Sequence, residues 1–335
     1  MLRFAIVGLG GLGKVHFRNV IGMEKERGDI RLVALCDVEQ ERFSDPVTTN
    51  LGGVEISVDI SKYNLYTDLD EMLHKEELDF VITAVPTYLH ERISVKVLER
   101  GIHVFSEKPM ALNLEQCENM IKVAREKGKI LMIGQCLRYW PEYCRLKEMY
   151  DSKEFGELIR AEFLRYSPTP TWSWQNWMMD YDKSGCAALD LHVHDVDFIN
   201  HAFGKPISVY SLATHHVTKF DSIFTHYEYE DMVVTSSCDW GMVDTYPFRP
   251  QFVARFEKAS VEMSEGALRI YEPGKEPRIE QLNPENAYVS EINDFINCIK
   301  VGRESTINNP ESVMQSLRIA LCEMESALKG EKVYV

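Results

Sequence analysis

Residues 2–13 read LRFAIVGLGGLG. The first half is a short apolar run, which is typical of a strand buried on both faces of a parallel sheet. The second half is a G-x-G-x-x-G turn, and an amphipathic pattern that predicts a helix follows it. In such a turn Gly8 permits the bend, Gly10 lets the backbone approach a pyrophosphate, and Gly13 allows close helix–strand packing. The expected dinucleotide contacts are Gly8, Gly10, Gly11, Leu12 and Gly13.

Further strand and helix patterns alternate through the first 134 residues. Short apolar runs recur at 32–35, 80–84, 103–105 and 130–133. Between them lie helical stripes, one ended by Gly101 and another opened by Asn113 as an N-cap. This alternation predicts a doubly wound parallel α/β sheet, a Rossmann fold, with right-handed crossovers. Residues 44–64 interrupt the rhythm, and an irregular loop and a short extra hairpin both fit them.

The pattern changes after about residue 135. Alternating apolar and polar residues, typical of antiparallel strands with one covered face, occur at 157–166, 206–218, 223–229, 232–240, 250–256 and 267–271. Helical patterns occur at 141–151, 185–203, 286–301 and 311–328. We therefore predict two domains. Residues 1–134 form an NAD(P)-binding Rossmann domain, and residues 135–335 form an α+β domain with an open, mostly antiparallel sheet.

Composition narrows the class of protein. The chain has 335 residues, of which 45% are hydrophobic and 27% charged, as expected of folded domains with sizeable cores. Its formal net charge of −15 argues against nucleic acid or an anionic membrane as the main partner. No apolar run approaches the ~20 residues of a membrane span. With no signal-peptide pattern and eight scattered cysteines that form no C-x-x-C pair, we expect a reduced, cytoplasmic protein.

Asp37 ends the second predicted strand and bears on the choice of cofactor. A carboxylate at this position accepts hydrogen bonds from the adenosine ribose and repels a 2′-phosphate, so NAD is favoured over NADP. Arg42, five residues further on, could reach a 2′-phosphate, and this possibility favours NADP.

Two clusters beyond the glycine turn carry candidate chemistry. Glu107-Lys108-Pro109 follows the fifth strand, at the edge where such sheets bind ligands. The alternative for Lys108 is an ordinary solvated surface lysine. Residues 190–197 read DLHVHDVD. If they are helical, Asp190 and His194 share one face and could serve proton transfer.

Two structural alternatives compete with proton transfer at residues 190–197. One is a helix face of satisfied polar groups. The other is a zinc site, which Asp and His at i, i+4 would suit. No third ligand has a recognisable spacing, so we expect no metal.

Together these motifs resemble the Gfo/Idh/MocA family of nicotinamide-dependent oxidoreductases, which includes inositol dehydrogenase and glucose–fructose oxidoreductase. The resemblance covers essentially the whole chain. Its matching parts are the G-x-G-x-x-G turn, Asp37, VPTYLH at 85–90, EKP at 107–109, D-x-x-x-H at 190–194 and YVSEINDFI at 288–296.

The resemblance implies roles for these residues. It implies a substrate cleft between the two domains, with Lys108 on the reacting hydroxyl and His194 as the general acid/base. Asp190 would bind substrate and tune His194. The remaining cofactor contacts would be Val85, Pro86, His90, Glu107 and Lys108, with Glu107 on a ribose.

One departure from the family pattern concerns His192. Many members carry a glycine there and a glycine run before the aspartate, whereas this chain has Ser184-Gly185-Cys186-Ala187-Ala188 and a second imidazole. The spacing favours His194 as the base.

The expected enzyme is an NAD(P)-dependent dehydrogenase that acts on a CH–OH group of a sugar, an inositol or a related polyol. Substrate contacts are expected from Lys108, Asp190 and His194, and from Arg138, Tyr139 and Trp177, although aromatic residues here could equally fill a core or an oligomer face. Three other classes remain: a glycosidase that works by transient oxidation with tightly held NAD, a non-catalytic NAD(H) or metabolite sensor, and a metal-dependent hydrolase. We expect a homodimer or homotetramer formed through the C-terminal sheet.

Overall fold

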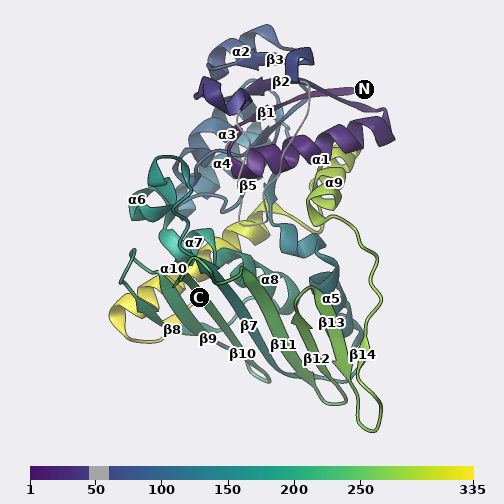
Figure 1. The fold of residues 1–335 in the computed structure, drawn as a ribbon, viewed down its shortest axis with the longest axis vertical. Helices are drawn as coiled ribbons and strands as arrows, with labels where there is room; N and C mark the ends of the chain where they lie inside the picture. Colours follow the sequence, from purple (N-terminus) through teal and green to yellow (C-terminus); the bar gives the residue numbers. More distant parts are fainter. Residues whose placement is uncertain (45–59) are drawn as a thin grey trace. The chain divides into compact units, whose positions relative to one another are not determined.

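The fold is that of a computed structural model, which describes residues 1–44 and 60–335 (Figure 1). The chain divides into two compact units. The first unit is Met1–Gly134 with Tyr288–Glu311, and the second is Gln135–Ala287 with Ser312–Val335.

The first unit contains a six-stranded sheet in the order β3-β2-β1-β4-β5-β6, with every neighbouring pair parallel. Its strands are β1 (Leu2–Val7), β2 (Ile30–Cys36), β3 (Asn64–Tyr66), β4 (Phe80–Thr83), β5 (His103–Glu107) and β6 (Leu131–Gly134). The predicted doubly wound parallel sheet is confirmed. The strand order reverses between β1 and β4, and ligands bind in such sheets beyond the carboxyl ends of the strands at this point.

Helices connect these strands: α1 (Gly11–Arg27), α2 (Leu69–Lys75), α3 (His90–Glu99) and α4 (Leu114–Glu126), with the short helices η1 (Gln40–Phe43), η2 (Ile60–Lys62) and η3 (Thr87–Leu89). The predicted cap of α4 is confirmed, because the Asn113 side chain accepts a hydrogen bond from the Gln116 N–H. Of the stretch 44–64 that interrupted the pattern, residues 45–59 lie outside the described residues. Strand β3 was not predicted.

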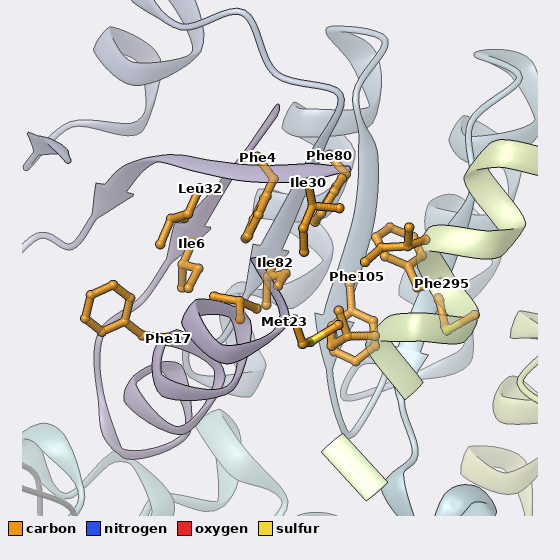
Figure 2. Close-up of a cluster of buried hydrophobic side chains, with 14 of the residues drawn as sticks. Phe4, Ile6, Phe17, Met23, Ile30, Leu32, Phe80, Ile82, Phe105 and Phe295 are labelled. Carbon is orange, nitrogen blue, oxygen red and sulfur yellow. The ribbon is translucent and has the colours of Figure 1, made fainter. Parts of the chain in front are cut away.

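Helix α9 (Ala287–Val301) supplies core residues to the first unit, although it lies far along the chain. The Phe295 ring packs edge-on against Phe80 and Phe105, with centroid distances of 5.5 and 5.7 Å (Figure 2). Ile292 and Ile296 are also buried in this cluster. The structure therefore differs from the predicted division, which gave all of 135–335 to the second domain.

The second unit contains a nine-stranded sheet in the order β14-β13-β12-β11-β7-β10-β9-β8-β15. Its strands are β7 (Leu158–Pro168), β8 (Ser208–Thr214), β9 (Ser222–Glu228), β10 (Val233–Met242), β11 (Arg249–Phe256), β12 (Ser260–Ser264), β13 (Ala267–Tyr271), β14 (Arg278–Ile279) and β15 (Val333–Tyr334). Only β7 and β10 pair in parallel, so the predicted mostly antiparallel sheet is confirmed. Strands β12, β14 and β15 were not predicted.

Four helices pack against one face of this sheet: α5 (Pro141–Ser152), α7 (Cys186–Asp190), α8 (Val193–Phe203) and α10 (Pro310–Lys329). The unit also contains α6 (Tyr181–Ser184) and the short helices η4 (Cys136–Tyr139) and η5 (Trp174–Met179). Tyr143 of α5 packs against Phe198 of α8 and Phe252 of β11. The opposite face carries exposed apolar side chains, among them Leu212 and Phe224. In the ranges described, none of the helices is long and apolar enough to span a membrane.

Candidate active site

The glycine turn joins β1 to α1, and the packing of the protein itself requires two of its glycines. Gly8 has a φ of +88°, and a Cβ added there would lie 2.4 Å from the carbonyl oxygen of Ala84. A Cβ on Gly13 would lie 1.9 Å from the carbonyl oxygen of Gly8. Both distances are far below van der Waals contact, so the turn closes only with glycine at these positions.

Gly10 differs from these two glycines. It is the N-cap of α1, its φ is −67°, and a Cβ added there would meet no atom of the described residues within 4 Å. Packing therefore does not require glycine at this position. A bare backbone at a helix N-terminus is suited to an anionic group, because free N–H groups and the helix dipole point toward it. The turn thus fits the pyrophosphate of NAD.

Asp37 links the end of β2 to the glycine turn. Its Oδ2 accepts a hydrogen bond from the Leu9 N–H at 2.6 Å, and its Oδ1 accepts one from the Glu39 N–H at 2.9 Å. Each carboxylate oxygen has a second lone pair, and the residue is partly exposed. Asp37 can therefore fix the turn and still accept from a ribose hydroxyl.

His90 opens α3, and its imidazole is fully buried. Its Nδ1 lies 2.7 Å from the carbonyl oxygen of Pro109, and its Nε2 lies 2.8 Å from that of Val85. Burial lowers the pKa of His90 below its ordinary value. The structure thus places this ring in the interior, where it ties the loop after β4 to the loop after β5. Val85 and Pro86 remain partly exposed.

Lys108 follows β5 directly, and its peptide bond to Pro109 is cis. Among residues 104–111 it is the one that is not buried. Glu107, by contrast, is 4% exposed and turned inward. Its Oε1 accepts a hydrogen bond from His16 Nε2 at 2.6 Å, and its Oε2 accepts one from the Lys108 N–H at 3.1 Å. The ribose contact expected of Glu107 stays a prediction.

In the second unit, Asp190 and His194 do not lie on one continuous helix, so that prediction is wrong. Helix α7 ends at Asp190 and α8 begins at Val193. Between them the His192 N–H donates to the carbonyl oxygen of Ala187, five residues back, which is the wider spacing of a π-turn. Asp190 is buried, whereas His194 is the one residue of the run 184–199 that is not buried.

The second imidazole, His192, belongs to the core. It is fully buried, and its Nε2 lies 3.0 Å from Oε2 of Glu323 on α10 and 3.5 Å from the Tyr227 hydroxyl oxygen. The two histidines of the motif therefore have different environments, and only His194 is accessible.

Arg138, an expected substrate contact, is also an interior residue. Its guanidinium is fully buried and donates from Nε and Nη2 to the two oxygens of Asp197, at 2.8 and 2.7 Å. The structure therefore gives Arg138 a structural role in the interior, and its substrate contact stays a prediction. Tyr139 and Trp177 are partly exposed.

The segment before α6 contains two residues in the left-handed region. Gln175 and Asn176 have φ values of 49° and 54°, and both are exposed. Non-glycine residues in this region cost about 1–3 kcal/mol each and cluster at functional sites. Since they precede Trp177 directly, this segment remains a candidate for substrate contact.

Comparison with known proteins agrees with this geometry. Residues 2–135 match the family described as "Oxidoreductase family, NAD-binding Rossmann fold", and residues 143–262 match the "GFO/IDH/MocA C-terminal domain". The chain belongs to the Gfo/Idh/MocA family. Its first unit is therefore the NAD-binding Rossmann fold of a family of oxidoreductases.

Curated relatives in this family are similar over part of their length. The chain is 29% identical over 204 residues to a 2,7-anhydro-N-acetylneuraminate hydratase from Mediterraneibacter gnavus, covering 60% of this chain and 49% of the relative. It is 26% identical over 207 residues to a myo-inositol 2-dehydrogenase from Thermotoga maritima, covering 62% and 56%. The chain thus spans about half the length of the curated relatives it matches.

Solved structures share the whole fold. One is a levoglucosan dehydrogenase in complex with NADH and levoglucosan, with a TM-score of 0.82 at 16% identity. The match covers 100% of this chain and 99% of that one. At this identity the likeness establishes a shared fold alone.

One group of buried polar residues, which includes the neighbour of Lys108, was not predicted from the sequence. His16, Glu107 and Glu291 lie together in the first unit, and all three are buried. The available signals were an imidazole within the apolar stripe of α1 and a carboxylate within the largely apolar helix α9. Neither pattern indicates that these side chains meet, because residue 291 lies far along the chain from the other two.

Proposed function

We propose that this protein is a dehydrogenase that uses NAD to oxidise a hydroxyl carbon of a sugar, an inositol or a related polyol. The observation that carries the proposal is a shared pattern in the two units. Lys108 and His194 are each the single accessible residue of an otherwise buried run, and both lie within the ranges that match the two Gfo/Idh/MocA domain families. An ammonium and an imidazole are the groups that an alcohol oxidation needs.

NAD, when bound, supplies the hydride acceptor for the carbinol carbon. In the proposed mechanism His194 takes the proton from the reacting hydroxyl as general base. Lys108 donates a hydrogen bond to the same oxygen and stabilises the negative charge that develops there. Asp190 binds a neighbouring hydroxyl and orients His194.

The choice of NAD over NADP rests on Asp37. Its carboxylate lies at the end of β2 against the glycine turn, so a 2′-phosphate on the adenosine ribose would meet a negative charge. Arg42 lies in η1 and is the residue that could offset this repulsion.

Support for a polyol substrate comes from relatives and from aromatic residues. The names of the relatives include a myo-inositol 2-dehydrogenase, and a structural neighbour holds levoglucosan. The partly exposed Tyr139 and Trp177 suit the apolar face of a sugar ring.

A second candidate is a redox-neutral reaction in which the substrate is oxidised only transiently. The observation in its favour is the similarity to a protein named as a hydratase. This candidate predicts NAD that stays bound through purification and no net release of NADH.

We also propose that the open face of the second sheet packs against a second copy of the chain. Tyr210, Leu212, Phe224 and Val253 are 40–55% exposed on this sheet. Leu212 and Phe224 are paired across β8 and β9, and exposed apolar residues that lie together in this way mark interaction sites. Sedimentation of the purified protein tests this, and a monomer at micromolar concentration would contradict it.

The test of function is NADH formation when the purified protein and NAD are offered a panel of inositols, aldoses and sugar acids, with NADP in parallel. We expect a signal with NAD for one class of polyol. A signal with NADP alone would overturn the role of Asp37. A silent panel together with retained NAD would support the redox-neutral candidate or a sensor.

A further inference from the structure

Three buried ionisable side chains meet beneath the Lys108 loop. His16 comes from α1, Glu107 from the end of β5 and Glu291 from α9. Their exposed fractions are 0%, 4% and 0%. One nitrogen or oxygen atom from each lies within 4.8 Å of the others. We refer to these three residues as the acid cluster.

The hydrogen bonds of the acid cluster are unevenly distributed. Glu107 has a partner on each oxygen, namely His16 Nε2 and the backbone N–H of Lys108. Neither carboxyl oxygen of Glu291 has a hydrogen-bond partner in the described part of the chain. The same holds for Nδ1 of His16.

An ionised Glu291 does not suit this environment. A buried carboxylate with no donor against it is strongly disfavoured, and a second negative charge beside Glu107 adds repulsion. Burial, together with the charge of Glu107, holds the pKa of Glu291 well above its ordinary value. The ionisable groups that face Glu291 from the other elements of the cluster are His16 on α1 and Glu107 on β5. The neutral acid is the form compatible with all of these observations.

A divalent cation is the alternative occupant of such a cluster. Two ligands of a tetrahedral zinc ion at ~2.0–2.1 Å from the metal lie about 3.3 Å apart. His16 Nε2 and Glu107 Oε1 are 2.6 Å apart, which is a hydrogen-bond distance. The geometry therefore favours a proton over a metal.

The acid cluster acts on Lys108 through the residue next to it. Glu107 precedes Lys108 and is held by His16, while the carbonyl oxygen of Pro109, which follows Lys108, is held by His90. A charged Glu291 would repel the Glu107 carboxylate and loosen the first of these two anchors. A neutral Glu291 leaves it in place.

We propose that Glu291 is a positioning residue that carries a proton in the acid cluster, and that this keeps Glu107 hydrogen-bonded to His16 and fixes the position of Lys108. The consequence for turnover rests on the proposed function of Lys108. The protonation of Glu291 does not rest on that proposed function, and it can be measured separately.

The first test is the infrared difference spectrum of wild type minus Glu291→Gln at neutral pH. We expect a band from the carbonyl stretch of a protonated carboxylic acid that is absent in the variant. A difference spectrum with only carboxylate bands would overturn the proposal. The infrared band of a protonated Glu291 does not depend on catalytic activity. A protein that is inactive on every polyol would therefore contradict the proposed function without contradicting the protonation of Glu291.

The second test compares kcat of Glu291→Ala and Glu291→Gln on the most active polyol of the panel. We expect kcat to fall about 10- to 100-fold in Glu291→Ala, because small misplacements of catalytic groups have effects of this size. Glu291→Gln, which is neutral and of the same shape, should restore most of it. A matched control is Asp294→Asn, which neutralises the carboxylate that accepts from the Ser305 hydroxyl one turn further along α9 and should leave kcat unchanged.

Two outcomes would overturn the proposal in this second test. One is a Glu291→Gln variant as slow as Glu291→Ala, which would assign a charged carboxylate to the cluster. The other is a stoichiometric divalent metal in the purified wild type that is lost in Glu291→Gln, which would make these residues ligands.

Discussion

The loop around Lys108 in the first unit and the turn around His194 in the second each position one polar side chain. They differ in the buried ionisable residues that surround that side chain. Each presents one accessible polar residue from a buried run. Around His194, several buried ionisable side chains lie close to one another. Asp195 is bound by Arg165 at 2.8 and 2.9 Å, and His192 lies against Glu323.

Around Lys108 the buried charges are unequal in number, because two carboxyl groups share one imidazole. An arginine–carboxylate pair such as Arg165–Asp195 keeps its charges across the physiological pH range, whereas two carboxyl groups beside one imidazole can hold a proton between them. A fixed ion pair therefore supports the turn around His194, and a protonation state supports the loop around Lys108.

The largest effects are expected at the two accessible residues. His194→Ala should lower kcat about 10²–10⁴-fold, and Lys108→Ala about 10²–10³-fold, because a general base and a charge-stabilising donor are lost. NAD affinity, measured by calorimetric titration, should be kept in both. Equal loss of NAD binding in the two variants would instead make these residues structural.

The paired interior of the second unit predicts a large effect on stability. Arg138→Ala leaves Asp197 buried without its cation and should lower the free energy of unfolding by about 3–5 kcal/mol. The double variant Arg138→Met with Asp197→Leu should recover most of this loss, since no buried charge remains. Denaturant titration measures both, and a double variant as unstable as the single one would show that the pair does more than neutralise charge.

The parallel sheet and the glycine turn can be predicted from the sequence alone, because the residue patterns that indicate them are local. A strand buried on both faces must be apolar throughout, as at Phe4–Val7, and Gly8 and Gly13 are required by contacts within one turn. The Asn113 cap is equally local. Lys108 and His194 could be nominated from their motifs in the same way.

What the sequence does not predict depends on contacts between distant residues. Arg138 is indistinguishable from a substrate-binding arginine until Asp197, 59 positions later, is seen beside it. A wider backbone turn interrupts the helix after Asp190, and no pattern of side chains in the sequence predicts that turn. Helix α9 looks like any amphipathic helix, and only its packing on Phe80 and Phe105 assigns it to the first unit.

Within the glycine turn, one glycine is required by the packing of the protein and another is expected to serve cofactor binding. Gly13→Ala places a Cβ against the carbonyl of Gly8 and should destabilise the protein by about 1–3 kcal/mol, as overpacking does. Gly10→Ala meets no such contact, so stability should change by less than about 0.5 kcal/mol. Its NAD affinity should nevertheless fall about tenfold, since the methyl group occupies space for the pyrophosphate. Unchanged NAD binding in Gly10→Ala would contradict the placement of the pyrophosphate there.

Two further predictions concern the pH dependence of stability, and they have opposite signs in the two units. The folded pKa of Glu291 is raised by burial and by Glu107, so the folded protein keeps a proton that the unfolded chain loses. This contribution to stability is lost as the pH rises above the ordinary glutamate range. The free energy of unfolding of Glu291→Gln, relative to wild type, should therefore increase from pH 5 to pH 8, by at most about 1.4 kcal/mol per pH unit.

His201 in the second unit should give the opposite slope. Burial, aided by Arg138, lowers its pKa from 6.5 to about 4, so the folded protein holds fewer protons than the unfolded chain between these values. Stability from this group is present above pH 6.5 and is lost as the pH falls toward 4. His201→Asn should flatten the acid side of the stability profile, and Glu291→Gln should flatten the other side. If both variants run parallel to wild type across pH 4–8, neither group contributes the difference in bound protons between the folded and unfolded chain that its shifted pKa implies.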